Sequence, residues 1–351
     1  MSYRLVPYTK EWESAAGRAN IRLASSGAAP YLLPDRAAPI AAAGPIGRQH
    51  WLVADAGDEI RGGCLLQSQP AWVDGEEALA VNVQSPLSEG LADRSHAGLA
   101  PWLIREIVRR HPFAYSVGMG GETMPYPRLL RALGWRLELV PFYFRVLAGR
   151  WFLANMRPLR RHPKWGWLAA SGGAFPLLSD VAFALLHAWR TRELNLATAA
   201  GHSAPQWTAL RSGYGFAIDR TPATLDALYP LADRSFVRFR VPGAVGVLRG
   251  TAFRGHAYFG DLFVATLVEA VCQPGAERAL LDASVSEARA LGAGLLLTNQ
   301  TSPELRRSFE SAGWLAYPSN YLLAFSPPLA ARVGGQPVYV NRGDGDGLLN
   351  L

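Results

Sequence analysis

Two carboxylates stand where the sequence could carry acid–base chemistry. Asp261 lies in an apolar run, 257–263, that predicts a strand. Its carboxylate could take a proton from an amine, or it could end the strand by accepting hydrogen bonds from backbone amides. Glu122 follows Gly118-Met-Gly-Gly and could either bind a substrate or sit as an exposed loop acid. Asp261 and Glu122 are therefore the candidate bases, each with a structural alternative.

Two amides, Asn299 and Gln300, end another expected strand. They could bind a substrate amide or a sugar hydroxyl. They could also belong to a capping network for a helix that begins at Pro303, where Thr301 and Ser302 stand nearer the cap. We treat Asn299 and Gln300 as candidate substrate ligands.

Other catalytic patterns are missing from the sequence. The seven histidines show no metal-ligand spacing with the two cysteines, Cys64 and Cys272. No Gly-x-Ser-x-Gly elbow occurs, and Gly118-Met-Gly-Gly is not a phosphate-binding P-loop. We expect no metal site, and so few cysteines fit a reducing compartment.

The elements that must position these residues occur twice. Each copy reads as an amphipathic helix, a short apolar strand, a helix begun by proline, a Gly-Trp pair and a Tyr-bearing strand. The first four of these start near Pro101, Phe113, Pro127 and Gly134 in the first copy, and near Glu277, Gly294, Pro303 and Gly313 in the second. Each glycine suits the left-handed residue that follows a helix. A duplicated α/β domain explains this order.

Further strands are predicted upstream of each copy. In the first half they cover 3–7, 51–54, 60–70 and 78–83, with a helix over 12–23. In the second half they cover 214–218, 235–241, 245–254 and 257–263, with a helix from about 221. Asp74-Gly75 between two apolar runs is a strong hairpin signal. The tail from Pro327 is rich in glycine, and we expect it to be irregular.

This order of elements resembles the GNAT acyltransferase fold. The resemblance predicts an α/β (α+β) chain with two tandem GNAT-like domains, 1–147 and 213–327, joined by a basic helical linker, 148–212, and followed by a tail, 328–351. Each domain would be a mixed, mostly antiparallel sheet flanked by helices. The arrangement is similar to that of mycothiol synthase, N-myristoyltransferase and the FemABX aminoacyl transferases.

The resemblance also implies a binding site for acyl-CoA. The family's motif, Gln/Arg-x-x-Gly-x-Gly/Ala, opens a helix whose free amides hold the pyrophosphate. The first half matches it in part, and the resemblance places the donor against Val83, Ser95, Ala97, Gly98, Leu99 and Ala100. The second half offers only Gln273-Pro-Gly-Ala, a poorer match. Small residues at 98 and 100 could instead serve close packing of helix and strand.

One family feature is absent from both halves. The tyrosine that often protonates the departing thiolate is replaced by Leu130 in the first copy and Phe309 in the second. Another acid or solvent could supply the proton, or the domain could be inactive. A thiol ionises near pH 8.5, so a missing acid would slow acyl transfer without forbidding it.

The net charge of +7 is concentrated in the linker. Eight basic residues and a single acid, Asp180, lie in the segment from Phe144 to Arg192, which begins just before the linker and also contains four tryptophans. A run around 175–189 predicts an apolar helix. Trp and Arg beside such a helix suit a membrane surface, which suggests peripheral contact through 148–192. The alternatives are a helix buried between the halves and, with an aminoacyl-tRNA donor, contact with RNA.

Three functions remain open from the sequence. The leading hypothesis is an acyltransferase that moves an acyl group from acyl-CoA, such as acetyl-CoA, to an amine or hydroxyl of a sugar or lipid-linked saccharide. The second is a FemABX-like transferase that uses aminoacyl-tRNA. The third is a non-catalytic scaffold at the membrane. With a polar N-terminus and no convincing membrane span, we expect a cytoplasmic protein that does not bind DNA.

Overall fold

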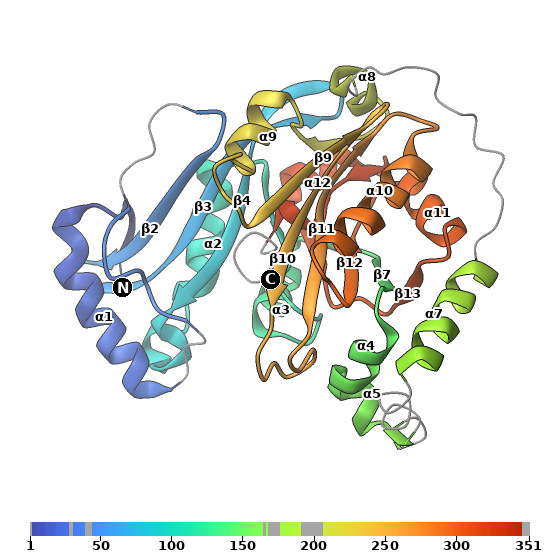
Figure 1. Ribbon diagram of the computed structural model, residues 1–351. Coiled ribbons are helices and arrows are strands. Elements are labelled where there is room, and N and C mark those ends of the chain that lie inside the picture. The colour runs from blue at the N-terminus through green and yellow to red at the C-terminus, as the bar shows by residue number, and fades with distance from the viewer. Residues whose placement is uncertain are drawn as a thin grey trace. The chain divides into compact units, whose positions relative to one another are not determined.

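The computed structural model describes residues 2–27, 31–38, 44–163, 166–167, 176–190 and 206–345 (Figure 1). Lys164, Trp165 and Arg192 of the basic segment lie outside the described residues, as does the end of the tail, 346–351.

The chain forms two compact units, and each is discontinuous in sequence. Unit 1 comprises Met1–Leu139, Gly215–Asp219 and Leu322–Gln336, and unit 2 comprises the remainder. The first half of the chain therefore contributes a strand to the sheet of unit 2, and the second half contributes strands to the sheet of unit 1. The boundaries expected from the sequence, 147 and 213, follow the chain order instead.

Unit 1 is a mixed, mostly antiparallel sheet with helices on both faces. Its strands are β1 (Tyr3–Pro7), β2 (Gly47–Asp55), β3 (Ile60–Val73), β4 (Glu76–Ser88), β5 (Ala114–Val117), β6 (Arg136–Leu139), β8 (Phe216–Ile218) and β14 (Leu322–Phe325). Its helices are α1 (Glu13–Ser26), α2 (Leu99–Arg110), α3 (Pro125–Ala132) and α12 (Pro327–Val333). The main path runs β1-β2-β3-β4-β5-β14-β6, and only β4 and β5 are parallel neighbours on it.

Unit 2 repeats this plan. Its sheet has the order β13-β7-β12-β11-β10-β9, from strands β7 (Phe142–Val146), β9 (Phe236–Val241), β10 (Ala244–Ala252), β11 (Phe263–Cys272), β12 (Leu295–Asn299) and β13 (Leu315–Tyr317). Only β11 and β12 run parallel. The helices that cover or extend it are α4 (Gly149–Asn155), α5 (Arg157–Arg161), α7 (Pro176–Arg190), α8 (Trp207–Arg211), α9 (Pro222–Leu228), α10 (Glu277–Ala290) and α11 (Pro303–Ser311). Figure 1 shows α10 and α11 beside this sheet. The predicted fold class, two mixed, mostly antiparallel sheets flanked by helices, is confirmed.

Local signals in the sequence account for much of this pattern. Gly134 and Gly313 follow α3 and α11 with φ of 80° and 76°, the left-handed conformation expected there. Asp74 and Gly75 join β3 to β4 with φ of 48° and 89°, as a type I′ turn requires. The expected apolar helix of the linker is α7.

Two predictions of secondary structure are wrong. The strand expected over 257–263 is a turn closed by mutual hydrogen bonds between the backbones of His256 and Gly260, and the strand β11 begins only at Phe263. The tail expected to be irregular begins with the helix α12 and continues in β15 (Val338–Tyr339) and a short 3-10 turn, Arg342–Asp344. Proline at the first turn of α12 favours a helix, and the later glycines masked this signal.

Candidate functional site

The parallel strands of unit 1 separate at their carboxyl ends. β4 pairs with β5 at Val81 and Asn82. One step further, the Ser116 hydroxyl donates to the Val83 carbonyl oxygen at 2.7 Å. Beyond this point Ser85 has a φ of 47°, and the register between β3 and β4 shifts. Such a bulge turns β4 away from its neighbour, so the two strands open into a wedge.

Helix α2 begins after this wedge with an accessible N-terminus. The first amides of a helix have no acceptor inside the helix, and they carry its positive dipole end. Ala97 and Gly98 are exposed there. A Cβ on Gly98 would meet nothing within 4 Å, and its φ of −75° is open to any residue. Close packing of helix and strand, the alternative left open by the sequence, therefore does not explain Gly98.

The other expected donor-binding residues surround this N-terminus. Ser95 is exposed, and its amide donates to Asp93 Oδ1 at 2.9 Å. Ala100 is half-buried. The side chains of Val83 and Leu99 lie in the core beneath α2, so only their backbones could contact a ligand.

The sheet face opposite α2 carries polar residues that sequence reasoning missed. Arg48 Nε donates to Gln67 Oε1 at 2.8 Å, and Gln67 Nε2 donates to Gln69 Oε1 at 2.9 Å. Gln69 in turn donates to the Tyr115 hydroxyl. The neighbouring Asn82 is also buried. The signal in the sequence was the alternation of amides with apolar residues along β3 and β4, which places the amides on one face.

His50 lies on the same face as these amides. It pairs with Leu65 on β3, which pairs with Gln84 on β4, so the three residues form one row across the sheet. Residues directly opposite in antiparallel strands share a face. Burial lowers the pKa of His50, which keeps its imidazole neutral near pH 7 and able to accept a proton. Sequence reasoning missed it because a single histidine in a strand carries no spacing signal.

Glu122 lies at the surface of unit 1. It follows β5 and forms an ion pair with Arg131 of α3 at 2.9 Å, and both side chains are about half exposed. Glu122 therefore has the geometry of an exposed loop acid, which was the alternative left open by the sequence.

The corresponding wedge in unit 2 is filled by its own chain. Thr298 Oγ1 donates to the Leu267 carbonyl oxygen at 2.8 Å, which repeats the Ser116 contact of unit 1. Beyond it, Gln300 forms a β-bridge with Asn341 of the tail. The backbone of Gly343 packs so tightly on β11 that an added Cβ would lie 2.8 Å from the Val268 carbonyl oxygen.

Buried ions hold this tail segment in place. Arg220 Nε lies 3.2 Å from Glu269, and Arg220 NH2 lies 2.5 Å from Asp344 Oδ2. All three side chains are at most 1% exposed. Asn341 also donates to Glu269. Burial raises the pKa of Glu269 to about 7, against the lowering effect of Arg220. Fully paired ions of this kind contribute to a unique packing arrangement.

Asn299 and Gln300, the expected substrate ligands, are part of this packing. Asn299 Nδ2 donates to the carbonyl oxygens of Val140 and Pro141 at 3.3 Å, and Asn299 Oδ1 accepts from Arg342. Gln300 Nε2 donates to Thr298 Oγ1 at 3.2 Å. Both side chains are 1% exposed. The helix cap that follows is Ser302 alone, whose hydroxyl accepts from the Leu305 amide.

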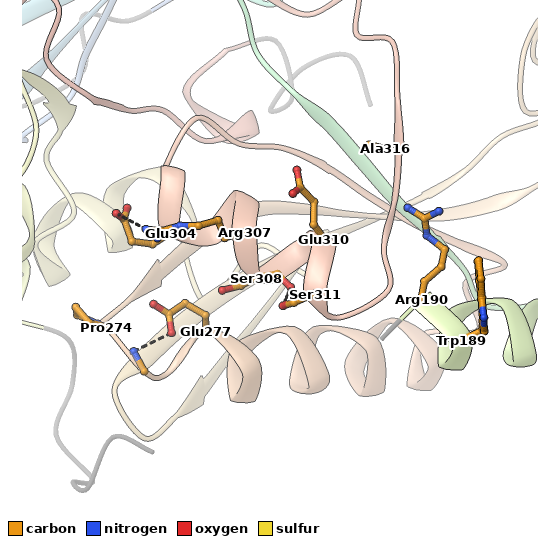
Figure 2. A pocket seen from close by; sticks show the side chains of 11 residues that line it. Trp189, Arg190, Pro274, Glu277, Glu304, Arg307, Ser308, Glu310, Ser311 and Ala316 are labelled. Atoms are coloured by element: carbon orange, nitrogen blue, oxygen red, sulfur yellow. Dashed lines mark hydrogen bonds and ion pairs between the residues drawn. The ribbon is translucent and has the colours of Figure 1, made fainter. Parts of the chain in front are cut away.

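The start of α10 in unit 2 differs from the start of α2. Glu277 is 4% exposed, and its Oε2 accepts from the Gly275 amide at 2.8 Å. A carboxylate of the chain itself thus occupies the position of an anionic ligand. The adjoining cavity, of about 790 Å³, is lined by Trp189, Arg190, Pro274, Gly275, Glu277, Glu304, Arg307, Ser308, Glu310, Ser311 and Ala316. Figure 2 shows the Glu277 and Glu304 contacts there. Its three glutamates outnumber its two arginines, Arg190 and Arg307, so the lining disfavours a phosphate ligand.

Asp261 precedes β11 and so lies at the opposite end of that strand from the start of α10. Its Oδ1 accepts from the Gly255 amide at 2.7 Å, and its own amide donates to Asn155 Oδ1 at 3.1 Å. The carboxylate caps the turn before β11, as the structural alternative had it. No group of histidine, cysteine, aspartate and glutamate that could hold a metal occurs among the residues the structure describes.

Leu130 and Phe309, at the positions of the family's tyrosine, are fully buried. Phe309 stacks on Tyr143 with ring centroids 5.1 Å apart. Neither residue can donate a proton. Tyr126 lies one helical turn before Leu130 on α3 and packs against the same core.

Comparison with known proteins finds likeness only at the level of structure. No protein-family model matches the sequence, and no curated protein matches it. N-myristoyltransferase of Saccharomyces cerevisiae, with bound myristoyl-CoA, is 11% identical with a TM-score of 0.45, over 92% of this chain and 82% of that one. GCN5-related N-acetyltransferases are also similar. The one from Anabaena variabilis is 10% identical (TM-score 0.44; 92% and 72% covered), and the one from Kribbella flavida is 13% identical (TM-score 0.46; 92% and 70% covered).

Proposed function

We propose that this chain is an N-acyltransferase that takes its acyl group from acyl-CoA, with the donor bound at unit 1. The single observation that carries the proposal is the contrast between the two helix N-termini. The start of α2 is accessible at Gly98, near the point where β4 and β5 stop pairing. The start of α10 carries Glu277, which accepts a hydrogen bond from the Gly275 amide, and the wedge of unit 2 is filled by the tail. The start of α2 therefore suits an anionic donor better than the start of α10.

The residues of unit 1 suit acyl transfer to a polar amine. Backbone amides at Gly98 and Ala100 would hold the pyrophosphate. His50 would accept the proton that the amine loses as its nitrogen bonds to the thioester carbon and the thiolate leaves. Arg48 and His50 are the more accessible polar residues of that face, and they favour an acceptor rich in hydroxyl groups, such as an amino sugar. A thiolate needs little help to leave near neutral pH, which fits the absence of the usual tyrosine.

Calorimetry with acetyl-CoA and longer acyl-CoAs tests the proposal. We expect one molecule bound per chain. Gly98→Glu should weaken binding about tenfold or more, because its carboxylate would face the phosphates. Gly335→Glu is the matched control in unit 1, since a Cβ there also meets nothing within 4 Å. The proposal fails if no acyl-CoA binds, or if both variants bind equally well. Release of free thiol in the presence of amino sugars then measures transfer.

A further inference from the structure

Helix α7 packs on unit 2 with one face only. That inner face carries Ser179, Phe183 and His187, spaced by four residues. The Phe183 ring meets Phe152 of α4 edge-on with centroids 5.5 Å apart, and His187 Nδ1 lies 2.9 Å from the Gly313 carbonyl oxygen. These contacts determine which side of the helix faces away from the unit.

The outer face of α7 is apolar and exposed. Leu178 is 70% exposed, Val181 55%, Leu185 64% and Trp189 82%. Their spacing of three or four residues places them in one stripe along the helix. Soluble proteins rarely leave such a continuous apolar stripe open to water unless it contacts something.

Basic side chains are exposed on α7 and on the two helices before it. Arg190 ends α7, and Arg150, Arg160 and Arg161 are exposed on α4 and α5. Figure 1 shows α4, α5 and α7 together at one end of unit 2. The carboxylate of Asp180, the single acid between residues 144 and 192, accepts a hydrogen bond from the Arg150 amide at 3.1 Å. These three helices therefore carry net positive charge, and glutamates border the stripe at Trp189, which lines the cavity described above.

We propose that the outer face of α7 docks on the surface of an anionic membrane. Exposed Trp189 and Trp151 suit the headgroup level of a bilayer, and the arginines suit anionic lipid. A second copy of the chain fits less well, because a two-fold contact would bring the same arginines together. No helix among the described residues is long and apolar enough to cross a membrane. The proposed contact places α7 along the surface, with its apolar stripe toward the lipid. The proposal is independent of the acyltransferase function.

Cosedimentation of the full chain with vesicles tests the docking. We expect binding to vesicles of equal parts phosphatidylcholine and phosphatidylglycerol, and little binding to phosphatidylcholine alone. Leu185→Glu combined with Trp189→Ala should reduce binding about tenfold or more. Leu231→Glu is the control, because Leu231 is 82% exposed in unit 2 away from α7.

The charge contribution is measured in the same assay. Arg160→Glu combined with Arg161→Glu should also reduce binding about tenfold or more, whereas Arg234→Glu combined with Arg240→Glu should not. Since all these side chains are exposed, circular dichroism should show every variant folded. Failure of the wild-type chain to bind anionic vesicles overturns the proposal, as does an equal loss in variant and control. A dimer that Leu185→Glu dissociates would overturn it in favour of a second copy.

Discussion

Replacing Arg220 by methionine tests whether the buried ions of unit 2 stabilise its fold. The guanidinium contacts Glu269 and Asp344, and all three side chains are withdrawn from water. Methionine has a similar length and no charge, so it removes the cation while largely filling its space. Two carboxylates then remain buried without their counter-ion.

The expected loss of stability is large. Removing one partner of a buried ion pair costs about 3–5 kcal/mol, because the remaining charge is uncompensated. For a unit of this size each kcal/mol lowers the melting temperature by about 2–4 °C. The Arg220→Met variant should therefore melt about 6–20 °C lower than the wild type. Arg240→Met, at an exposed position of the same unit, should change stability by less than about 0.5 kcal/mol.

The loss should also grow with pH. The pKa of Glu269 in the folded chain is about 7, above its ordinary value of 4.5. A raised pKa means that the folded state holds the proton more tightly, so this contribution is full below pH 4.5 and is lost as pH rises through 7. Without Arg220 the pKa rises further, and the deficit should be greater at pH 8 than at pH 6. Adding Glu269→Gln should reduce this pH dependence and leave the part that comes from Asp344.

Thermal melts followed by near-ultraviolet circular dichroism, at both pH values, measure the effect. Equal melting temperatures for wild type and Arg220→Met would refute the reasoning.

Three further predictions concern single residues. His50→Gln should lower kcat about a hundredfold with little change in KM. It should also abolish the acid limb of the pH–rate profile. In the wild type this limb should lie below the ordinary pKa of imidazole, because burial lowers the pKa of His50. Gly149→Val should lower the free energy of unfolding in urea by roughly 1–3 kcal/mol, because a Cβ there would lie 2.6 Å from the Ser179 carbonyl oxygen and force α4 from α7. Glu277→Ala should lower the free energy of unfolding by about 1 kcal/mol in the same assay. Calorimetry should still show one acyl-CoA bound per chain, because the tail still fills the wedge of unit 2.

Local signals explain why much of the fold could be predicted. Three kinds of signal each depend on only a few neighbouring residues: the Gly-Trp pairs, the prolines that start α3 and α11, and Asp74-Gly75. They can therefore be recognised in the sequence alone. The strand β11 was misplaced because the apolar and aromatic residues before Phe263, among them Tyr258 and Phe259, have the composition of a strand. The buried Glu269 in the true strand gave no clue to its partners.

The candidate site residues show the same difference between local features and contacts of distant segments. Gly98 was singled out by its match to the family's motif, and the structure places it at the N-terminus of α2, where the motif expects it. The sequence also showed that Leu130 and Phe309 cannot donate a proton. It did not show that Asn299 binds the tail, or that His50 shares a row with Gln84, because both depend on pairing between distant segments.

The sequence by itself determined the duplicated order of elements, the ends of several helices, and the concentration of positive charge near α7. Only the tertiary structure decided which wedge the tail fills. That outcome depends on Arg220, Glu269 and Asp344, which are far apart in the chain and meet only when the tail enters the wedge of unit 2. The tertiary structure also decided that the apolar stripe of α7 faces outward. The sequence of α7 is apolar on both sides of the helix, so it does not indicate which side packs.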